Sequence, residues 1–150
     1  MKPGKVRSIA ICVFRVGNKI LVAEGYDQVK KQVFYRPLGG TIEFGEPAAK
    51  TIQREIQEEL NLDTMAIKYI GTLENIFTYE GQTGHEIVLI FDGEFQDAGV
   101  YHLPVLHGIE GDGAEITATW KELGEFSPGN SGLGPPLYPT GLLELLQDQI

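Results

Sequence analysis

Three glutamates crowd the segment AAKTIQREIQEEL. Glu55, Glu58 and Glu59 follow one another at spacings i, i+3 and i+4. On a helix these spacings place ionised carboxylates side by side, where each exposed pair is destabilising by about 0.2–0.5 kcal/mol. A hard divalent cation turns that repulsion into shared coordination, because such ions prefer carboxylate oxygens. The alternative is a solvated acidic face on which Glu59 is protonated or paired with an arginine.

A helix is expected over residues 46–60, which are good helix formers with no glycine or proline in the interior. Pro47 falls where a first-turn proline is favourable, and Asn61 supplies a left-handed stop.

The helical angle of each residue separates the three carboxylates. With about 100° per residue and Ile52 at zero, the apolar stripe runs from about −40° to about +80°. Glu59 falls at about −20° inside the stripe, Glu55 at about −60° on its edge, and Glu58 at about −120° outside it. One carboxylate is therefore expected to point toward a sheet, with two others beside it. The stripe itself comprises Ala48, Ala49, Ile52, Ile56 and Leu60.

The glycine pair before the helix completes the candidate site. Gly39 and Gly40 follow a β-rich run and allow an unusual loop to pack against the helix start. A carbonyl oxygen from such a loop is a ligand that magnesium accepts alongside carboxylates.

This region resembles the Nudix hydrolase box, whose pattern covers 23 residues from Gly40 to Leu62. The pattern is Gly, five residues, Glu, seven residues, Arg-Glu, an apolar residue, any residue, Glu-Glu, any residue, Gly and an apolar residue. Only the last glycine departs from it, replaced by Asn61, which also tolerates the left-handed conformation. The matching positions are Gly40, Glu46, Arg54, Glu55, Ile56, Glu58, Glu59 and Leu62.

The resemblance implies roles for individual residues. Glu55, Glu58 and Glu59, helped by the carbonyl of Gly39, would hold one or more Mg²⁺ or Mn²⁺ ions. Arg54 would orient Glu55, and Arg54, Glu55 and Glu58 form the expected catalytic set. Glu55 is the first candidate for the general base.

Other candidates lie outside the box. Glu110 and Glu115, in the stretch GIEGDGAE, are the candidates for a base or ligand supplied by a late loop, as in some family members. Substrate-binding candidates come from segments that border the nucleotide pocket of the resembling fold, where arginine can clamp phosphate and aromatic rings can stack on a base. They are Arg7, Arg36, Tyr35 and Tyr79, with Phe34 beside them.

The remaining elements are expected to be mostly strands. Two β-rich runs in residues 6–26 join across 16–18, a polar surface loop covers 99–115, and a C-terminal helix covers 139–150. Mixed strands with two helices predict an α+β fold, and the resemblance specifies an α/β/α sandwich with a mixed sheet in one domain, residues 1–150. Further strands are expected at 32–40, 66–79, 85–95 and 115–123, the second and third of these four joined by the loop 80–84.

Composition limits the classes of function. A net charge of −9 repels nucleic acid and anionic lipid, so neither a nucleic acid polymer nor a membrane is an expected partner. One cysteine, Cys12, lies in an apolar run and is expected to be an inert core thiol. With no leader or membrane span evident in the sequence, we expect a cytoplasmic protein. The apolar LLELL segment could pair two copies in a homodimer.

The function expected from the resemblance is metal-dependent hydrolysis of the diphosphate linkage in a nucleoside diphosphate derivative. The alternative is a catalytically inactive Nudix-like module that binds a nucleotide or a protein and regulates something. The complete glutamate set argues against that alternative.

Overall fold

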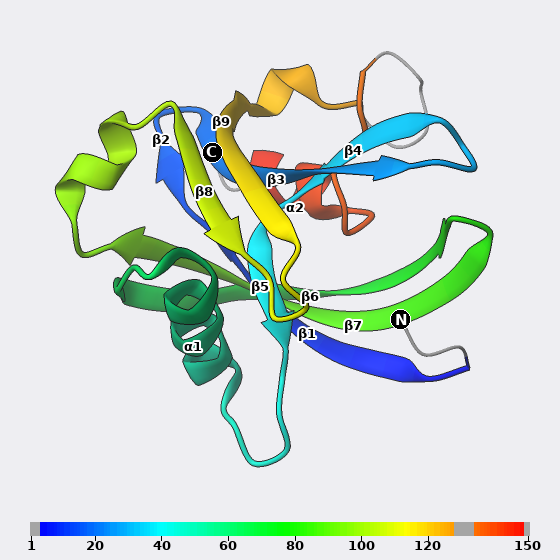
Figure 1. The fold of residues 1–150 in the computed structure, drawn as a ribbon, viewed down its shortest axis with the longest axis horizontal. Coiled ribbons are helices and arrows are strands. Elements are labelled where there is room, and N and C mark those ends of the chain that lie inside the picture. The colour runs from blue at the N-terminus through cyan, green and yellow to red at the C-terminus, as the bar shows by residue number, and fades with distance from the viewer. Residues whose placement is uncertain (1–3, 128–133, 149–150) are drawn as a thin grey trace.

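The computed structural model describes residues 4–127 and 134–148, which form two β-sheets and two helices (Figure 1). Two short 3-10 turns at Ala98–His102 and Leu123–Glu125 complete the described structure. The elements in chain order are β1 (Val6–Val13), β2 (Arg15–Val16), β3 (Lys19–Asp27), β4 (Gln32–Arg36), β5 (Leu38–Thr41), α1 (Ala48–Leu60), β6 (Thr64–Tyr79), β7 (Gln82–Phe95), β8 (Val105–Ile109), β9 (Glu115–Glu122) and α2 (Leu142–Gln147).

One sheet is mixed and the other is antiparallel. The mixed sheet has the order β5-β1-β7-β6, in which β1 and β7 run parallel and the other pairs run antiparallel. The second sheet has the order β2-β3-β9-β8, and β4 also pairs with β3. In Figure 1 the two sheets lie one above the other, and α1 lies beside β5 and below β8.

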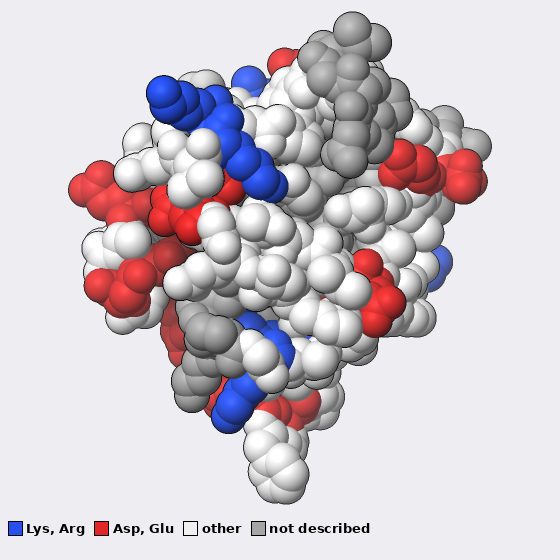
Figure 2. Space-filling view, turned by 90° about the vertical axis from the view of Figure 1, so that its right-hand side faces the viewer, with Lys and Arg blue, Asp and Glu red and all other residues white. Residues whose placement is uncertain are grey.

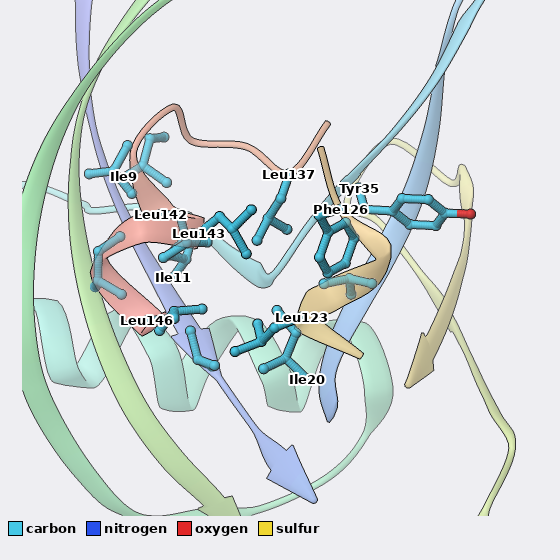
Figure 3. Packing of buried hydrophobic residues seen from close by; sticks show 14 residues of the cluster. Ile9, Ile11, Ile20, Tyr35, Leu123, Phe126, Leu137, Leu142, Leu143 and Leu146 are labelled. Atoms are coloured by element: carbon cyan, nitrogen blue, oxygen red, sulfur yellow. The ribbon is translucent and has the colours of Figure 1, made fainter. Parts of the chain in front are cut away.

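Strand β1 divides the core, because its successive side chains point to opposite faces. Ala10, Cys12 and Phe14 pack in a cluster with α1, whereas Ile9 and Ile11 pack in a cluster with α2. Figure 3 shows the second cluster, where the leucines of α2 lie against Ile9 and Ile11. The helices therefore cover opposite faces of a mixed sheet, as the expected α+β fold and α/β/α sandwich require. Cys12 is fully buried, and burial raises the pKa of its thiol.

The prediction of a surface loop over residues 99–115 is wrong in part. Strand β8 occupies Val105–Ile109 and pairs antiparallel with β9. Only Leu106 of this strand is buried, so the segment lacks the apolar alternation that identifies a strand in a sequence. Its β conformation comes from pairing with β9.

Both predicted hairpins are present with tighter turns than expected. The first closes at Gly17, whose φ of 59° suits a two-residue turn between β2 and β3. The second closes at Glu80 and Gly81, both with positive φ, rather than across the five residues 80–84. The first β-rich run is also interrupted at Phe14, so that β1 joins one sheet and β2 the other.

Helix α1 ends where it was predicted to end and begins two residues later. Asn61 adopts the left-handed conformation, with φ 55° and ψ 41°, as its replacement of the box glycine requires. Pro47 occupies the N-cap position, with an extended ψ of 144°, instead of the first turn. Glu46 therefore lies in the loop before the helix.

The C-terminal helix is shorter than predicted and its apolar face is already covered. Helix α2 begins after Gly141, and residues 149 and 150 lie outside the described part of the chain. Leu142, Leu143 and Leu146 are buried in the core of the same chain. This face is thus not available to pair two copies, as had been expected of the LLELL segment. None of the helices described is long and apolar enough to cross a membrane.

Candidate active site

Two buried isoleucines fix the helix that carries the glutamates. Ile52 and Ile56 are fully buried against the mixed sheet, which sets the rotation of α1. The Glu58 side chain is 59% exposed and the Glu55 side chain only 16%. Glu59 is half-buried. The helical angles therefore ranked Glu58 correctly as the outermost of the three, while Glu55 is more enclosed than an edge position predicts.

Arg54 is the counter-charge of this acidic group. Its Nη1 lies 2.9 Å from Glu55 Oε1 and 3.4 Å from Glu58 Oε2. Its Nη2 donates to the Thr41 carbonyl oxygen at 3.1 Å, which ties the helix to the end of β5. Glu46 is the strongest of several acidic partners that raise the pKa of the Arg54 guanidinium.

Glu46 is held in the loop before α1 mainly by the side chains of Arg54 and Thr51. Arg54 Nε donates to Glu46 Oε2 at 2.7 Å, and the Thr51 hydroxyl donates to Glu46 Oε1 at 2.7 Å. The hydrogen bond from Arg54 is the main reason that the pKa of Glu46 falls to about 2. Glu46 thus positions Arg54, and through it Glu55.

Glu59 has the opposite environment. Burial, followed by a hydrogen bond to the Glu55 carboxylate and the charges of Glu55 and Glu110, raises its pKa to about 8. Without a cation beside it, Glu59 therefore holds a proton at neutral pH and donates it to Glu55. A positive ion placed between these carboxylates would favour their ionised forms.

The glycine pair touches the site through backbone atoms. A Cβ built on Gly40 would lie 2.5 and 2.6 Å from the two carboxylate oxygens of Glu55, so only glycine leaves room for that side chain. A Cβ on Gly39 would instead meet the backbone of β1, including Ile11 Cα at 2.7 Å. Gly40 therefore makes room for Glu55, and Gly39 allows β5 to pack closely on β1.

A cavity of about 110 Å³ connects the box with more distant residues. It is lined by Gly39, Gly40 and Glu59, and also by three predicted candidates, Arg7, Arg36 and Glu110. At this cavity, Arg36 Nη2 lies 3.4 Å from Glu110 Oε1. Residues from both sheets and from α1 thus face one space.

The family model for the NUDIX domain matches residues 4–133 of this sequence. The chain belongs to the NUDIX family. No curated protein matches the sequence.

Solved structures with low sequence identity share the Nudix fold. A MutT NUDIX hydrolase from Burkholderia pseudomallei superposes with a TM-score of 0.63 at 16% identity, covering 97% of this chain and 98% of that chain. A NUDIX hydrolase from Nitrosomonas europaea gives a TM-score of 0.61 at 17% identity, with coverages of 97% and 88%. The ORF135 protein of E. coli gives a TM-score of 0.56 at 21% identity, with coverages of 96% and 90%. Family and fold together support a Nudix-type pyrophosphohydrolase.

Nudix proteins generally use divalent metal ions, and the donors of this site are of the right chemical type for a hard cation. Across residues 4–127 and 134–148, however, no three His, Cys, Asp or Glu side chains converge closely enough to hold a metal as they stand. The reason is that Glu55 and Glu58 both turn toward Arg54. Glu58 is exposed, so packing does not prevent its side chain from turning toward Glu55 and Glu59.

Other predicted residues of this Nudix chain lie away from the cavity. The Tyr35 ring packs on Phe126 in the core, with its hydroxyl donating to Glu24 at 2.9 Å (Figure 3). The Tyr79 ring meets Phe34 edge to face. Glu115 is exposed at the start of β9.

The structure also adds cavity residues that were not predicted. Asn75, Glu86 and Tyr138 line the same space as Arg7 and Glu59. Asn75 and Glu86 come from β6 and β7, whose register places them opposite each other. The register of two long strands cannot be read from one sequence without a buried face to fix it. The sequence Leu73-Glu74-Asn75-Ile76 places two polar residues side by side and shows no alternation, so no local signal identified Asn75 as a cavity residue.

The distribution of charged side chains on the surface is consistent with the net charge of −9. In the face shown in Figure 2, lysine and arginine side chains form small separate groups, with acidic side chains close to several of them. A phosphate-bearing ligand would therefore find positive charge in this Nudix protein at individual arginines or at a bound cation, rather than on a broad basic surface.

Proposed function

We propose that this Nudix protein is a metal-dependent hydrolase that cleaves the diphosphate linkage of a nucleoside diphosphate derivative. The observation that carries the proposal is one cavity lined by Gly39, by the box residues Gly40 and Glu59, and by Arg7 and Arg36. An acidic pocket repels a diphosphate unless a cation lies between them, and Arg7 and Arg36 add positive charge at the same cavity.

Glu55, Glu58 and Glu59 would hold the ion, Mg²⁺ or Mn²⁺, with help from the carbonyl of Gly39. Such an ion supplies charge neutralisation at phosphate oxygens and makes a bound water more acidic. The half-buried position of Glu59 and the room that Gly40 leaves for Glu55 support this assignment.

Glu55 is the proposed general base for attack of water on phosphorus. Its carboxylate is oriented by Arg54 Nη1 at 2.9 Å, and Arg54 is oriented in turn by Glu46. Glu110 is the second candidate, since it lies at the cavity and close enough to affect Glu59. Glu115 has the weaker geometric support of the two late acids.

Arg7 and Arg36 are proposed to bind phosphate oxygens. The Arg36 side chain is 60% exposed, and its Nη2 lies 3.4 Å from Glu110 Oε1. Arg7 is less mobile, because its Nη2 donates to the Thr41 hydroxyl at 2.9 Å. Stacking by Tyr79 or Tyr35 remains a prediction without support from the cavity lining.

Release of phosphate or pyrophosphate from a panel of nucleoside diphosphate derivatives and triphosphates with Mg²⁺ tests the proposal. We expect turnover by the wild type and loss of it in Glu58→Gln, whereas Glu94→Gln, an exposed carboxylate of β7, should behave as the wild type. Nucleotide binding without any turnover would instead support the inactive regulatory module.

The proposal also covers the partners of the protein and its location in the cell. We expect small-molecule nucleotides as partners and a cytoplasmic location. If two copies pair, they must use a surface other than the covered face of α2.

A further inference from the structure

Thr41 holds two arginines with its two oxygen atoms. Its hydroxyl accepts a hydrogen bond from Arg7 Nη2 at 2.9 Å, and its carbonyl oxygen accepts one from Arg54 Nη2 at 3.1 Å. Arg54 is the box arginine that contacts Glu55, whereas Arg7 lies on β1 and lines the cavity. One residue therefore connects the box with a cavity arginine that lies outside it.

The strand register places Thr41 within reach of Arg7. Strand β5 ends at Thr41, which lies opposite Ile9 of β1. Arg7 comes two residues before Ile9, so it is the diagonal neighbour of Thr41 on the same face, at a separation that a long side chain spans. Because β5 ends before the position opposite Arg7, the guanidinium turns to the Thr41 hydroxyl.

Glu86 contacts the same guanidinium from the other side. It lies opposite Arg7 on β7, and its Oε2 is 3.5 Å from Arg7 Nη1. Thr41 and Glu86 use different nitrogens of a rigid planar group, so together they limit its rotation. A guanidinium carries five N–H donors, and within residues 4–127 and 134–148 the structure gives Arg7 only these two acceptors. At least three donors therefore remain for an anionic ligand in the cavity.

The bond to the Thr41 hydroxyl is the stronger of the two contacts. At 2.9 Å it is a normal hydrogen bond, whereas the 3.5 Å approach to Glu86 is a long ion pair between partly exposed side chains, which contributes little. A phosphate that binds a freely moving arginine must order that side chain, which weakens binding by about two- to tenfold. An arginine that is already held in place avoids this cost.

We propose that Thr41 is a positioning residue for Arg7, whose guanidinium it holds at the cavity so that the remaining N–H groups meet phosphate oxygens of the substrate. The Thr41 carbonyl keeps Arg54 in place at the same time. The phosphate-binding arginine and the carboxylate that Arg54 orients are thus both positioned relative to one residue. Thr41 acts through Arg7 rather than on the substrate. The inference rests on the proposed function in taking Arg7 to bind phosphate.

Thr41→Val tests the proposal, because valine removes the hydroxyl and keeps the shape of the side chain and the carbonyl. We expect the dissociation constant for inorganic pyrophosphate, titrated calorimetrically in the presence of Mg²⁺, to rise about fivefold. Thr41→Ser retains the hydroxyl and should bind as the wild type does. Thr117→Val is the matched control, because Thr117 is an exposed threonine of β9, and it should leave the affinity unchanged.

A double-mutant cycle with Arg7→Ala shows whether Thr41 acts through Arg7. In the Arg7→Ala protein the hydroxyl has no guanidinium to hold, so adding Thr41→Val should cause no further loss of pyrophosphate affinity. Mn²⁺ binding should be the same in Thr41→Val and the wild type. The thermal unfolding midpoint should also stay close to that of the wild type, because Thr41 is exposed. For a substrate that is turned over, KM should rise by a larger factor than kcat falls.

Equal pyrophosphate affinity of Thr41→Val and the wild type would overturn the proposal, as would an equal loss in the wild-type and Arg7→Ala backgrounds. It would also be overturned by a serine variant as weak as the valine variant, or by a wild type that does not bind pyrophosphate. Thr41→Ala, which also lacks the hydroxyl, replaces Thr41→Val if circular dichroism shows that the valine variant is unfolded. Weaker binding that depends on Arg7, without hydrolysis of any nucleotide, would support the inference and contradict the proposed function.

Discussion

Replacing Gly40 by alanine should lower activity strongly in a protein that still folds. The added Cβ would lie 2.5 and 2.6 Å from the Glu55 oxygens, whereas ordinary contacts begin at 3.4 Å. Glu55 Cδ would lie nearer still, so the carboxylate must retreat by at least about 0.9 Å, the difference between 3.4 and 2.5 Å. Because the carboxylate lies at the end of a flexible side chain, it can move without displacing the backbone.

The consequences follow from what Glu55 is proposed to do. The retreat pulls Glu55 from its 2.9 Å contact with Arg54 and from its place beside Glu59. A misplacement of about 1 Å can cost about 10²-fold in rate, which corresponds to about 2.7 kcal/mol of transition-state stabilisation. The folded state loses at most one charge-assisted hydrogen bond, a loss of about 1.5–3 kcal/mol before relaxation.

Gly39→Ala is the matched comparison, because there the Cβ meets the β1 backbone and Ile11 Cα at 2.7 Å. We expect Gly39→Ala to lower the thermal unfolding midpoint severely, and Gly40→Ala to keep most of it while kcat/KM falls about 10²-fold. The measurements are calorimetric unfolding and kcat/KM at saturating Mg²⁺. A folded Gly40→Ala protein with wild-type kcat/KM would refute this reasoning.

Three further outcomes are expected. Because the pKa of Glu46 is lowered, its contribution to stability is fully present above the unfolded pKa of about 4.5 and is lost as the pH falls toward about 2. Glu46→Gln should therefore make the free energy of unfolding depend less on pH over that range. The raised pKa of Glu59 has the opposite sign: metal-free stability should decline as pH rises from about 4.5 through about 8, and Glu59→Gln should remove that decline in a series of unfolding midpoints. Asn61→Val should lower the free energy of unfolding by about 1–2 kcal/mol in denaturant unfolding, because a β-branched residue tolerates φ 55° poorly. An Asn61→Gly protein that is as unstable as the Asn61→Val protein would contradict the left-handed cap.

The helix and its cap could be predicted from the sequence because their signals are local. Periodicity placed Ile52 and Ile56 in the core, and left-handed propensity identified the role of Asn61. The same angles did not foresee that Thr51 would be buried, since its hydroxyl is satisfied by Glu46, a residue outside the helix.

Features that depend on pairing between distant segments could not be predicted. Strand β8 has one buried residue, Leu106, and owes its conformation to β9. The cavity wall formed by Arg7, Glu86 and Asn75 depends on the register of three strands that are separated in the chain. The motif resemblance predicted that Arg54 orients Glu55, whereas the contacts of Arg54 with Glu46 and with the Thr41 carbonyl depend on the path of the loop before α1.

Direct measurement of cation binding tests the proposed role of the glutamates most simply. In a Mn²⁺ titration followed by water proton relaxation, the wild type should show saturable occupancy, and Glu55→Gln should weaken or abolish it. Absence of saturable binding in the folded wild type, or unchanged binding after Glu55, Glu58 and Glu59 are all replaced by glutamine, would contradict a metal site at these carboxylates.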